Sequence, residues 1–160
     1  MPNPKSILNG QVGEHLVCAE LLRRRHVTCI MPAGYPDIDL VVLDQAHEVR
    51  HLVQVKFTPK RTSTWVLNDR SESVIDAKLI YVLVCISTDG QSYRFFCIPA
   101  GEVAPLVKAE NEAYVLKAQK RRPSYMDNSM RRITLAQPLT QKYEGNFGTF
   151  GVPSLPRQLQ

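Results

Sequence analysis

Eight consecutive residues, Leu79 to Ile86, carry apolar, aromatic or thiol side chains, and no other segment constrains the fold as strongly. A short continuous apolar run predicts a strand that is buried on both faces. Such a strand lies inside a sheet rather than at its edge. We therefore expect a central sheet that is covered on both sides.

The rest of the chain alternates between helical and strand patterns. Helical patterns cover residues 6–25, 71–77 and, with a break, 101–120. Strand patterns cover residues 27–31, 38–43, 49–57, 93–98 and, as a small edge strand, 131–135. Together these patterns predict an α/β fold with a central mixed sheet of about five strands flanked by helices.

The length suits one domain, because 160 residues with 44% hydrophobic content suffice for one core. We assign residues 1–136 to this domain. Residues 137–160 are rich in proline and glycine and are expected to form an irregular tail. Alternatively, aromatic residues pin this tail to the body or to a second subunit: Tyr143, Phe147 and Phe150.

The composition argues against a membrane protein and against a disulfide framework. No apolar run is long enough to span a bilayer, and the start Met1 to Lys5 lacks the apolar stretch of a secretory signal. A cytoplasmic protein without a membrane partner is expected. The absence of Cys-x-x-Cys spacing favours buried thiols over a zinc site for the four cysteines: Cys18, Cys29, Cys85 and Cys97.

Two acids and an amide-lysine couple lie on neighbouring strand patterns. Side chains alternate between the faces of a strand, so Asp37 and Asp39 share one face, and Gln54 and Lys56 share another. The polar segment between the two patterns is typical of a hairpin loop. A pair between residues 44 and 49 would set Asp39 opposite Gln54 and Asp37 opposite Lys56. This arrangement predicts a divalent-metal hydrolytic centre.

The first helix contributes a further acid, Glu14. An apolar stripe expected to face the core consists of Leu8, Val12, Leu16, Ala19 and Leu22, with Ser6 as a possible N-cap. Glu14 lies on a different stripe. It is either exposed or buried beside a cation or a hydrogen-bond donor, because a buried unpaired carboxylate is costly. Gly10 and Gly13 weaken the helix, which is easier to understand if another backbone approaches closely.

Basic residues gather at several places, and the net charge is +5, which is compatible with a polyanionic partner. The helix dipole accounts for the triplet at residues 23–25. The loop after Lys56 offers Lys60, Arg61 and Trp65, which suit phosphate contacts and base stacking, although Trp65 would equally fit the core. Arg121 and Arg122 extend the basic character.

The order of elements and motifs resembles the PD-(D/E)xK nuclease superfamily, which includes Holliday-junction resolvases and many restriction endonucleases. The resemblance covers residues 6–100 in an αβββαβ order. It identifies Glu14, Asp39, Gln54 and Lys56 as the matching positions, in a Gln-x-Lys variant of the motif. It implies a restriction-endonuclease-like core and a metal-dependent endonuclease of DNA processing, repair or defence, acting on DNA rather than RNA as a homodimer.

The resemblance also implies roles for these residues. Mg²⁺, with Mn²⁺ as a substitute, would bind Glu14, Asp39 and Gln54, and Lys56 would stabilise charge that develops on the phosphate. Gln54 stands where the superfamily usually has an acid, so it brings an oxygen ligand without a charge. Asp37 either supplies the missing charge or only shapes its turn.

Two alternatives remain open from the sequence. The chain could be a nuclease-like DNA-binding or assembly module with weak chemistry. Gln54, in place of the usual acid, would then be the sign of the lost activity. It could also be a small α/β protein-interaction domain whose acids merely decorate a strand.

Overall fold

The computed structural model describes residues 3–155. The helices are α1 (Pro4–Arg23), α2 (Ala100–Arg121) and α3 (Leu139–Tyr143), with 3₁₀ turns η1 (Asp69–Glu72) and η2 (Phe147–Phe150). The strands are β1 (Val27–Ile30), β2 (Leu40–Leu43), β3 (Val49–Thr58), β4 (Thr64–Asn68), β5 (Leu79–Ile86), β6 (Tyr93–Pro99) and β7 (Met130–Thr134).

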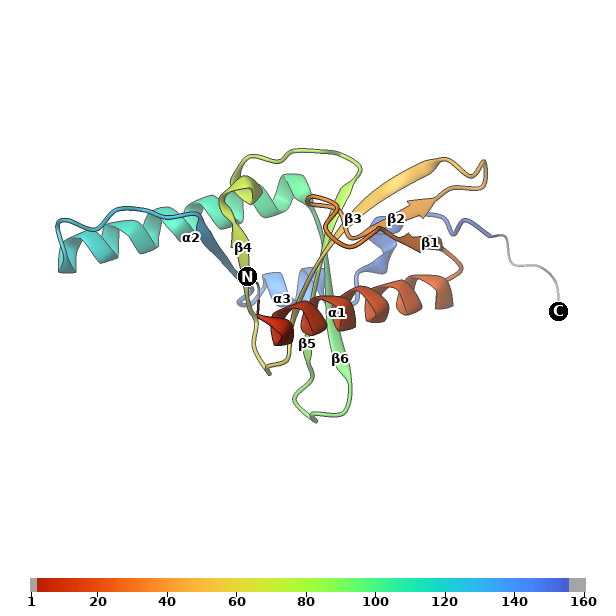
Figure 1. The fold of residues 1–160 in the computed structure, drawn as a ribbon, viewed down its shortest axis with the longest axis horizontal. Coiled ribbons are helices and arrows are strands. Elements are labelled where there is room, and N and C mark those ends of the chain that lie inside the picture. Colours follow the sequence, from red (N-terminus) through yellow and green to blue (C-terminus); the bar gives the residue numbers. More distant parts are fainter. Residues whose placement is uncertain (1–2, 156–160) are drawn as a thin grey trace.

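The central sheet has five strands in the order β1-β2-β3-β5-β6. β3 and β5 are parallel and the other neighbours are antiparallel, so the sheet is mixed. The strand β5 is buried along nearly its whole length, as its apolar run predicts. The expected fold class, a mixed sheet of five strands flanked by helices, is confirmed (Figure 1).

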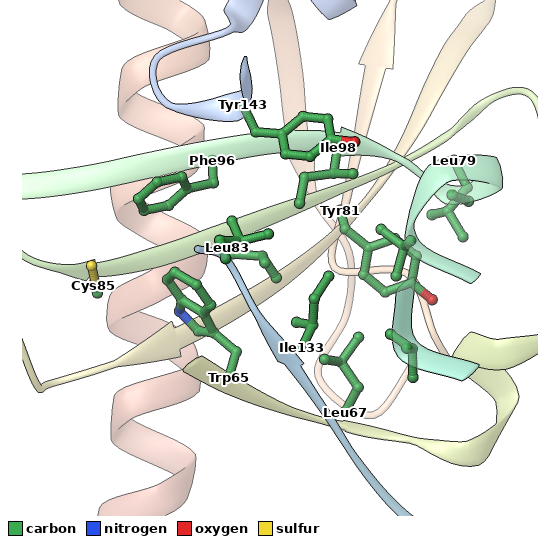
Figure 2. Close-up of a cluster of buried hydrophobic side chains, with 14 residues drawn as sticks. Trp65, Leu67, Leu79, Tyr81, Leu83, Cys85, Phe96, Ile98, Ile133 and Tyr143 are labelled. Carbon is green, nitrogen blue, oxygen red and sulfur yellow. The ribbon is translucent and has the colours of Figure 1, made fainter. Parts of the chain in front are cut away.

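Two apolar cores cover the two faces of this sheet. One contains α1, through Val17 and Leu21. The other contains α2 together with a two-stranded ribbon that β4 and β7 form. Figure 2 shows side chains of this ribbon, among them Trp65 and Ile133, packed against Leu83 of the central sheet.

The connection from β3 to β5 differs from the expected helix at residues 71–77. It contains β4 and the short turn η1 instead. The strand signal is weaker here, because β4 has only five residues and alternates, with Trp65 and Leu67 buried and Val66 exposed. Its partner β7, expected as a small edge strand, lies within one residue of the predicted range.

The helix α1 turns a different face to the core from the one expected. Leu8 is 61% exposed and Leu22 is 50% exposed, whereas the buried residues are Gly13, Val17 and Leu21. Both faces of α1 are apolar, and the glycine allows the closer approach to the sheet. The helix begins earlier than predicted, with Asn3 rather than Ser6 as its N-cap.

The helix α2 continues without the expected break. Pro105 lies within it, near its beginning. A proline inside a helix costs roughly 3 kcal/mol, and the burial of Val103, Ala104 and Val107 against the core offsets this cost. Figure 1 shows the second half of α2 extending beyond the sheet.

The tail from residue 137 is more ordered than predicted. It forms α3 and η2, and Tyr143, Phe147 and Phe150 are buried in the two cores. Its aromatic residues thus pin it to the body, which was the alternative expectation. Residues 156–160 lie outside the described residues.

The cysteines follow the prediction only in part. Cys85 and Cys97 are buried, Cys18 is half-buried and Cys29 is exposed. The expectation of a buried thiol is therefore wrong for Cys29, which alternates outward on the short edge strand β1.

Candidate active site

The β2–β3 hairpin keeps the predicted register beside the candidate site. Leu40 pairs with Val53, where the paired register ends, so the expected pair of Asp39 with Gln54 is not part of it. The Asp39 N–H instead donates to the Val53 carbonyl at 2.8 Å. The hairpin differs at its other end, where a β-bulge between Val42 and Leu43 removes the expected pair of residues 44 and 49.

The two strands part next to Asp39. β2 begins at Leu40, whereas β3 continues past Val53 to Thr58. The backbone N–H of Val55 therefore has no β2 partner, and Asp39 Oδ2 accepts its hydrogen bond at 2.6 Å. This fork in the sheet holds the Asp39 carboxylate in a fixed position.

The environment of Asp39 works against its negative charge. Burial raises its pKa, and the nearby Asp37 carboxylate adds to the rise. The Val55 hydrogen bond and the positive charge of Lys56 lower the pKa without cancelling the rise. A cation bound at Asp39 would relieve this penalty.

The sequence predicted Asp37 and Asp39 on one strand, but both precede β2. Asp39 is next to the strand and Asp37 is farther from it. Asp37 occupies a turn with φ of 62°, a conformation that aspartate tolerates better than most residues. Its Oδ2 accepts a hydrogen bond from Arg70 Nη1 at 2.7 Å. The structure thus gives Asp37 the turn-shaping place that was its alternative role.

Glu14 is half-buried on α1, so the alternative of a fully exposed carboxylate is wrong. Burial raises the pKa of Glu14, and the negative charge of Asp39 raises it further. The two carboxylates therefore repel each other across the space between α1 and the fork. Two such oxygens facing one space are the usual setting for a bound cation.

Lys56 lies on β3 beside this pair. Its charge lowers the pKa of Asp39, which places the ammonium group near that carboxylate. Within residues 3–155 the Lys56 side chain has no hydrogen bond or ion pair. The ammonium group is thus available to a ligand.

Glu14, Asp39 and Lys56 line one open cavity of about 500 Å³. They come from α1, from the residue before β2 and from β3. The remaining lining residues are Asn3, Lys5, Ser6, Asn9, Gly10, Val55 and Phe57. Three of the four predicted catalytic residues therefore meet at one place.

Gln54 is the residue that does not line this cavity. It is only 7% exposed, and it alternates with Val53 and Val55, which face α1. Its side chain therefore points to the same face of β3 as Lys56. In the part of the chain that the structure describes, its amide makes no hydrogen bond.

The donor set fits a hard divalent cation. Mg²⁺ in proteins is often held by one or two carboxylates, with waters and substrate phosphates completing its shell. Glu14 and Asp39 supply such carboxylates. No group of three His, Cys, Asp or Glu side chains suited to a metal occurs among residues 3–155, so any third protein ligand would be an amide or backbone oxygen.

The residues predicted to contact nucleic acid have different surroundings. Lys60 and Arg61 are exposed in the loop that follows β3. Trp65 is 2% exposed and its Nε1 donates to the Val84 carbonyl at 2.9 Å, so its expected base-stacking role is wrong. Arg121 is the last residue of α2 and Arg122 follows it, and both are exposed.

The arginine triplet lies at the C-terminal end of α1, where the helix dipole favours cations. Arg23 and Arg24 both form ion pairs with Glu20. The Arg24 guanidinium also lies 3.8 Å from the centre of the Phe147 ring.

Sequence reasoning missed the polar residues that the first turns of α1 contribute to the cavity. Ser6, Gly10 and Glu14 follow one another at intervals of four, and so do Lys5 and Asn9. Residues four apart lie on the same side of a helix. This spacing was the signal that could have identified them.

The chain resembles known proteins only distantly. No protein-family model matches it, and no curated protein matches it in sequence. A solved structure that matches is that of a bacterial homing endonuclease, I-Ssp6803I, with 18% identity and a TM-score of 0.46 over 90% of this chain and 88% of that one. No helix in residues 3–155 is long and apolar enough to cross a membrane.

Proposed function

We propose that the chain is a Mg²⁺-dependent endonuclease that hydrolyses phosphodiester bonds in DNA. One observation carries this proposal: Glu14, Asp39 and Lys56 line a single cavity although they come from three separate elements. The cavity combines two carboxylates with raised pKa values and a lysine without a hydrogen-bonded partner among the described residues. Metal-assisted hydrolysis of a phosphodiester uses this combination of anionic ligands and a cation near the phosphate.

The residues divide the chemistry between them. A bound Mg²⁺ would polarise the scissile phosphate and lower the pKa of an attacking water. Glu14 and Asp39 hold that cation, and the Val55 N–H keeps Asp39 in place. Lys56 binds a phosphate oxygen and stabilises the charge that develops there.

Gln54 is proposed as a further oxygen ligand. Its support is its place on β3 next to Val55, whose N–H binds Asp39, and on the same face of β3 as Lys56. Because its amide has no hydrogen bond among the described residues, it can turn toward an ion without losing one. An amide contributes no charge, so Gln54→Ala should reduce metal affinity less than Asp39→Ala.

The partners follow from the same chemistry. Lys60 and Arg61 lie exposed just beyond Lys56, where a nucleic-acid strand leaving the cavity would pass, and Arg121 and Arg122 add basic surface on α2. Cutting both strands of DNA generally requires two sites, so we propose a homodimer. We place the protein in the cytoplasm, where free cysteines persist.

Cleavage assays test this function. Purified protein is incubated with labelled DNA and RNA in Mg²⁺, in Mn²⁺ and in chelator, beside Lys56→Ala and Asp39→Ala. We expect cleavage of DNA only with metal, and a loss of at least about 10²-fold in each variant. Lys108→Ala, which removes an exposed lysine of α2 outside the cavity, is the matched control. Metal-dependent cleavage that survives both substitutions would refute the assigned site.

One observation favours a second candidate, a nuclease-like module that binds DNA with weak chemistry. Gln54 brings no charge and does not line the cavity. Calorimetric titration separates the two functions: DNA binding without any heat from Mg²⁺ or Mn²⁺ would favour the binding module.

A further inference from the structure

Gly10 has no structural reason to be a glycine. It is exposed in the second turn of α1, and a Cβ atom built there would meet only Glu14 Oε1, at 3.9 Å. At Gly13, by contrast, a Cβ would lie 2.5 Å from the Phe57 Cβ and 3.2 Å from Val55 Cγ1. Packing thus explains Gly13. Gly10 weakens the helix by about 1 kcal/mol relative to alanine, and nothing within the described protein compensates for this.

The surroundings of Gly10 point to a ligand outside the protein. Gly10 lies in the wall of the cavity, between Ser6 and Glu14 on one side of the helix. Lys5 and Asn9 line the same cavity. The Lys5 ammonium, the Asn9 amide and the Ser6 hydroxyl make no hydrogen bonds within residues 3–155.

These side chains share the cavity with the proposed catalytic residues. Lys56 comes from β3 and Lys5 from α1, and Glu14 and Asp39 line the same cavity. Two free ammonium groups in one cavity suit two neighbouring phosphates of one strand. An amide and a hydroxyl are the other common donors to phosphate oxygens.

We propose that a polynucleotide backbone lies directly against α1 at Gly10, and that Lys5 and Asn9 bind the phosphate next to the one that is cut. The inference rests on the proposed function, which supplies the substrate class. Gly10 is the place where the sugar-phosphate chain comes closest, because a side chain there would occupy its path. These contacts go to the backbone, so they position the strand without reading its sequence.

Gly10→Ala is the discriminating variant, because stability and binding should change in opposite directions. The methyl group meets no clash and favours the helix, so the melting temperature should rise or stay unchanged. The affinity for a fluorescent DNA duplex, measured by anisotropy in chelator, should fall at least about tenfold. Magnesium binding, measured by calorimetry, should stay as in the wild type, because Glu14 is not displaced.

Lys5→Ala provides the second measurement. It should weaken duplex binding and reduce the slope of log affinity against log salt by about 1, as the loss of one phosphate contact requires. Lys108→Ala is again the control, and it should leave binding and slope unchanged.

Three results would overturn the inference. The first is that Gly10→Ala binds DNA like the wild type. The second is a lower melting temperature, which would show that the glycine has a structural role. The third is weaker magnesium binding, which would show that the substitution acts through Glu14. Failure of the proposed function looks different. If the wild type never cleaves DNA while Gly10→Ala still loses affinity for it, the proposed catalysis is refuted. The inference that DNA binds against α1 is then retained.

Discussion

At Asp39, a single carboxylate serves two purposes that differ in their effect on stability. Its oxygen accepts the Val55 N–H hydrogen bond, which stabilises the fork between β2 and β3. Its charge is buried, which destabilises the fold and raises its pKa. A residue kept only for structure would satisfy Val55 without the charge. The charge is what the proposed cation site requires.

Asp39→Asn should therefore stabilise the protein while it weakens magnesium binding. The amide oxygen of this variant would still accept the Val55 hydrogen bond. Because the folded-state pKa of Asp39 lies above the unfolded value, near 3.8, its stabilising contribution is fully present below that value and is lost as pH rises through the folded pKa. The variant should thus gain most near neutral pH, by roughly 1 to 3 °C in melting temperature. Calorimetric titration and thermal unfolding at several pH values measure the two effects.

Asp37→Asn is the comparison for this experiment. It removes an acid whose pair with Arg70 is solvent-exposed, so its effect on stability should be small. Asp37 also raises the pKa of Asp39, so its loss should lower that pKa in an NMR titration. An Asp39→Asn variant that melts well below the wild type at neutral pH would contradict the argument.

Much of the candidate site could be predicted at the level of residues. Strand alternation and the apolar pattern predicted the register of β2 against β3, in which Leu40 pairs with Val53. They gave no information on where β2 begins, and the wrong start put Asp37 on the strand instead of in its turn. The place of Trp65 depended on tertiary packing, because an indole suits a core and a base equally.

At the scale of elements, Gly13 sets the distance between α1 and β3. A Cβ at this position would lie 2.5 Å from the Phe57 Cβ, an atom fixed to the β3 backbone. Gly13→Ala should therefore push the helix from the sheet and destabilise the protein by about 1 to 3 kcal/mol, as measured by urea denaturation. Because Glu14 is the next residue, magnesium affinity should fall as well.

The control for this prediction is Gly10→Ala, which makes the same chemical change in the same helix where no clash occurs. Equal stability changes at the two glycines would show that α1 does not approach the sheet as closely as the structure indicates.

The sequence pattern could not predict which face of α1 packs against the sheet. The helix has one apolar stripe that includes Leu8 and Leu22, and another that includes Val17 and Leu21. Hydrophobic periodicity alone could not choose between them. The choice depends on the closer approach that Gly13 allows. The central strand β5 needed no such choice, since its whole length is apolar.

At the scale of the whole molecule, the C-terminal segment joins the far end of the sheet through two histidines. The rings of His26 and His51 lie 5.8 Å and 5.6 Å from the ring of Phe150, which is fully buried. His51 Nε2 lies 3.2 Å from the Phe150 carbonyl oxygen. Arg50 donates to the Val152 carbonyl at 2.8 Å. Composition alone predicted an irregular tail. It could not reveal these contacts, because they join residues about a hundred positions apart in the sequence.

This junction should make stability depend on pH. Burial lowers the pKa of both His26 and His51, and the charge of Arg50 lowers both further. The hydrogen bond to the Phe150 carbonyl raises the pKa of His51 without cancelling this fall. Since the folded pKa values lie below the unfolded value of 6.5, the stabilising contribution is fully present above pH 6.5 and is lost as pH falls through the folded values. The melting temperature should drop as the pH falls below about 6.5, by roughly 2 to 4 °C per kcal/mol lost.

The double variant His26→Phe, His51→Gln tests which groups cause this dependence. Phenylalanine keeps the ring and removes the buried Nδ1 of His26, which has no partner in the described structure. Glutamine keeps a donor for the Phe150 carbonyl and does not titrate in this range. The drop in melting temperature should shrink in this variant and persist in His47→Asn, which changes an exposed histidine. If the double variant lost as much stability on acidification as the wild type, the pH sensitivity would belong to other groups, and the two histidines would only fill space beneath the tail.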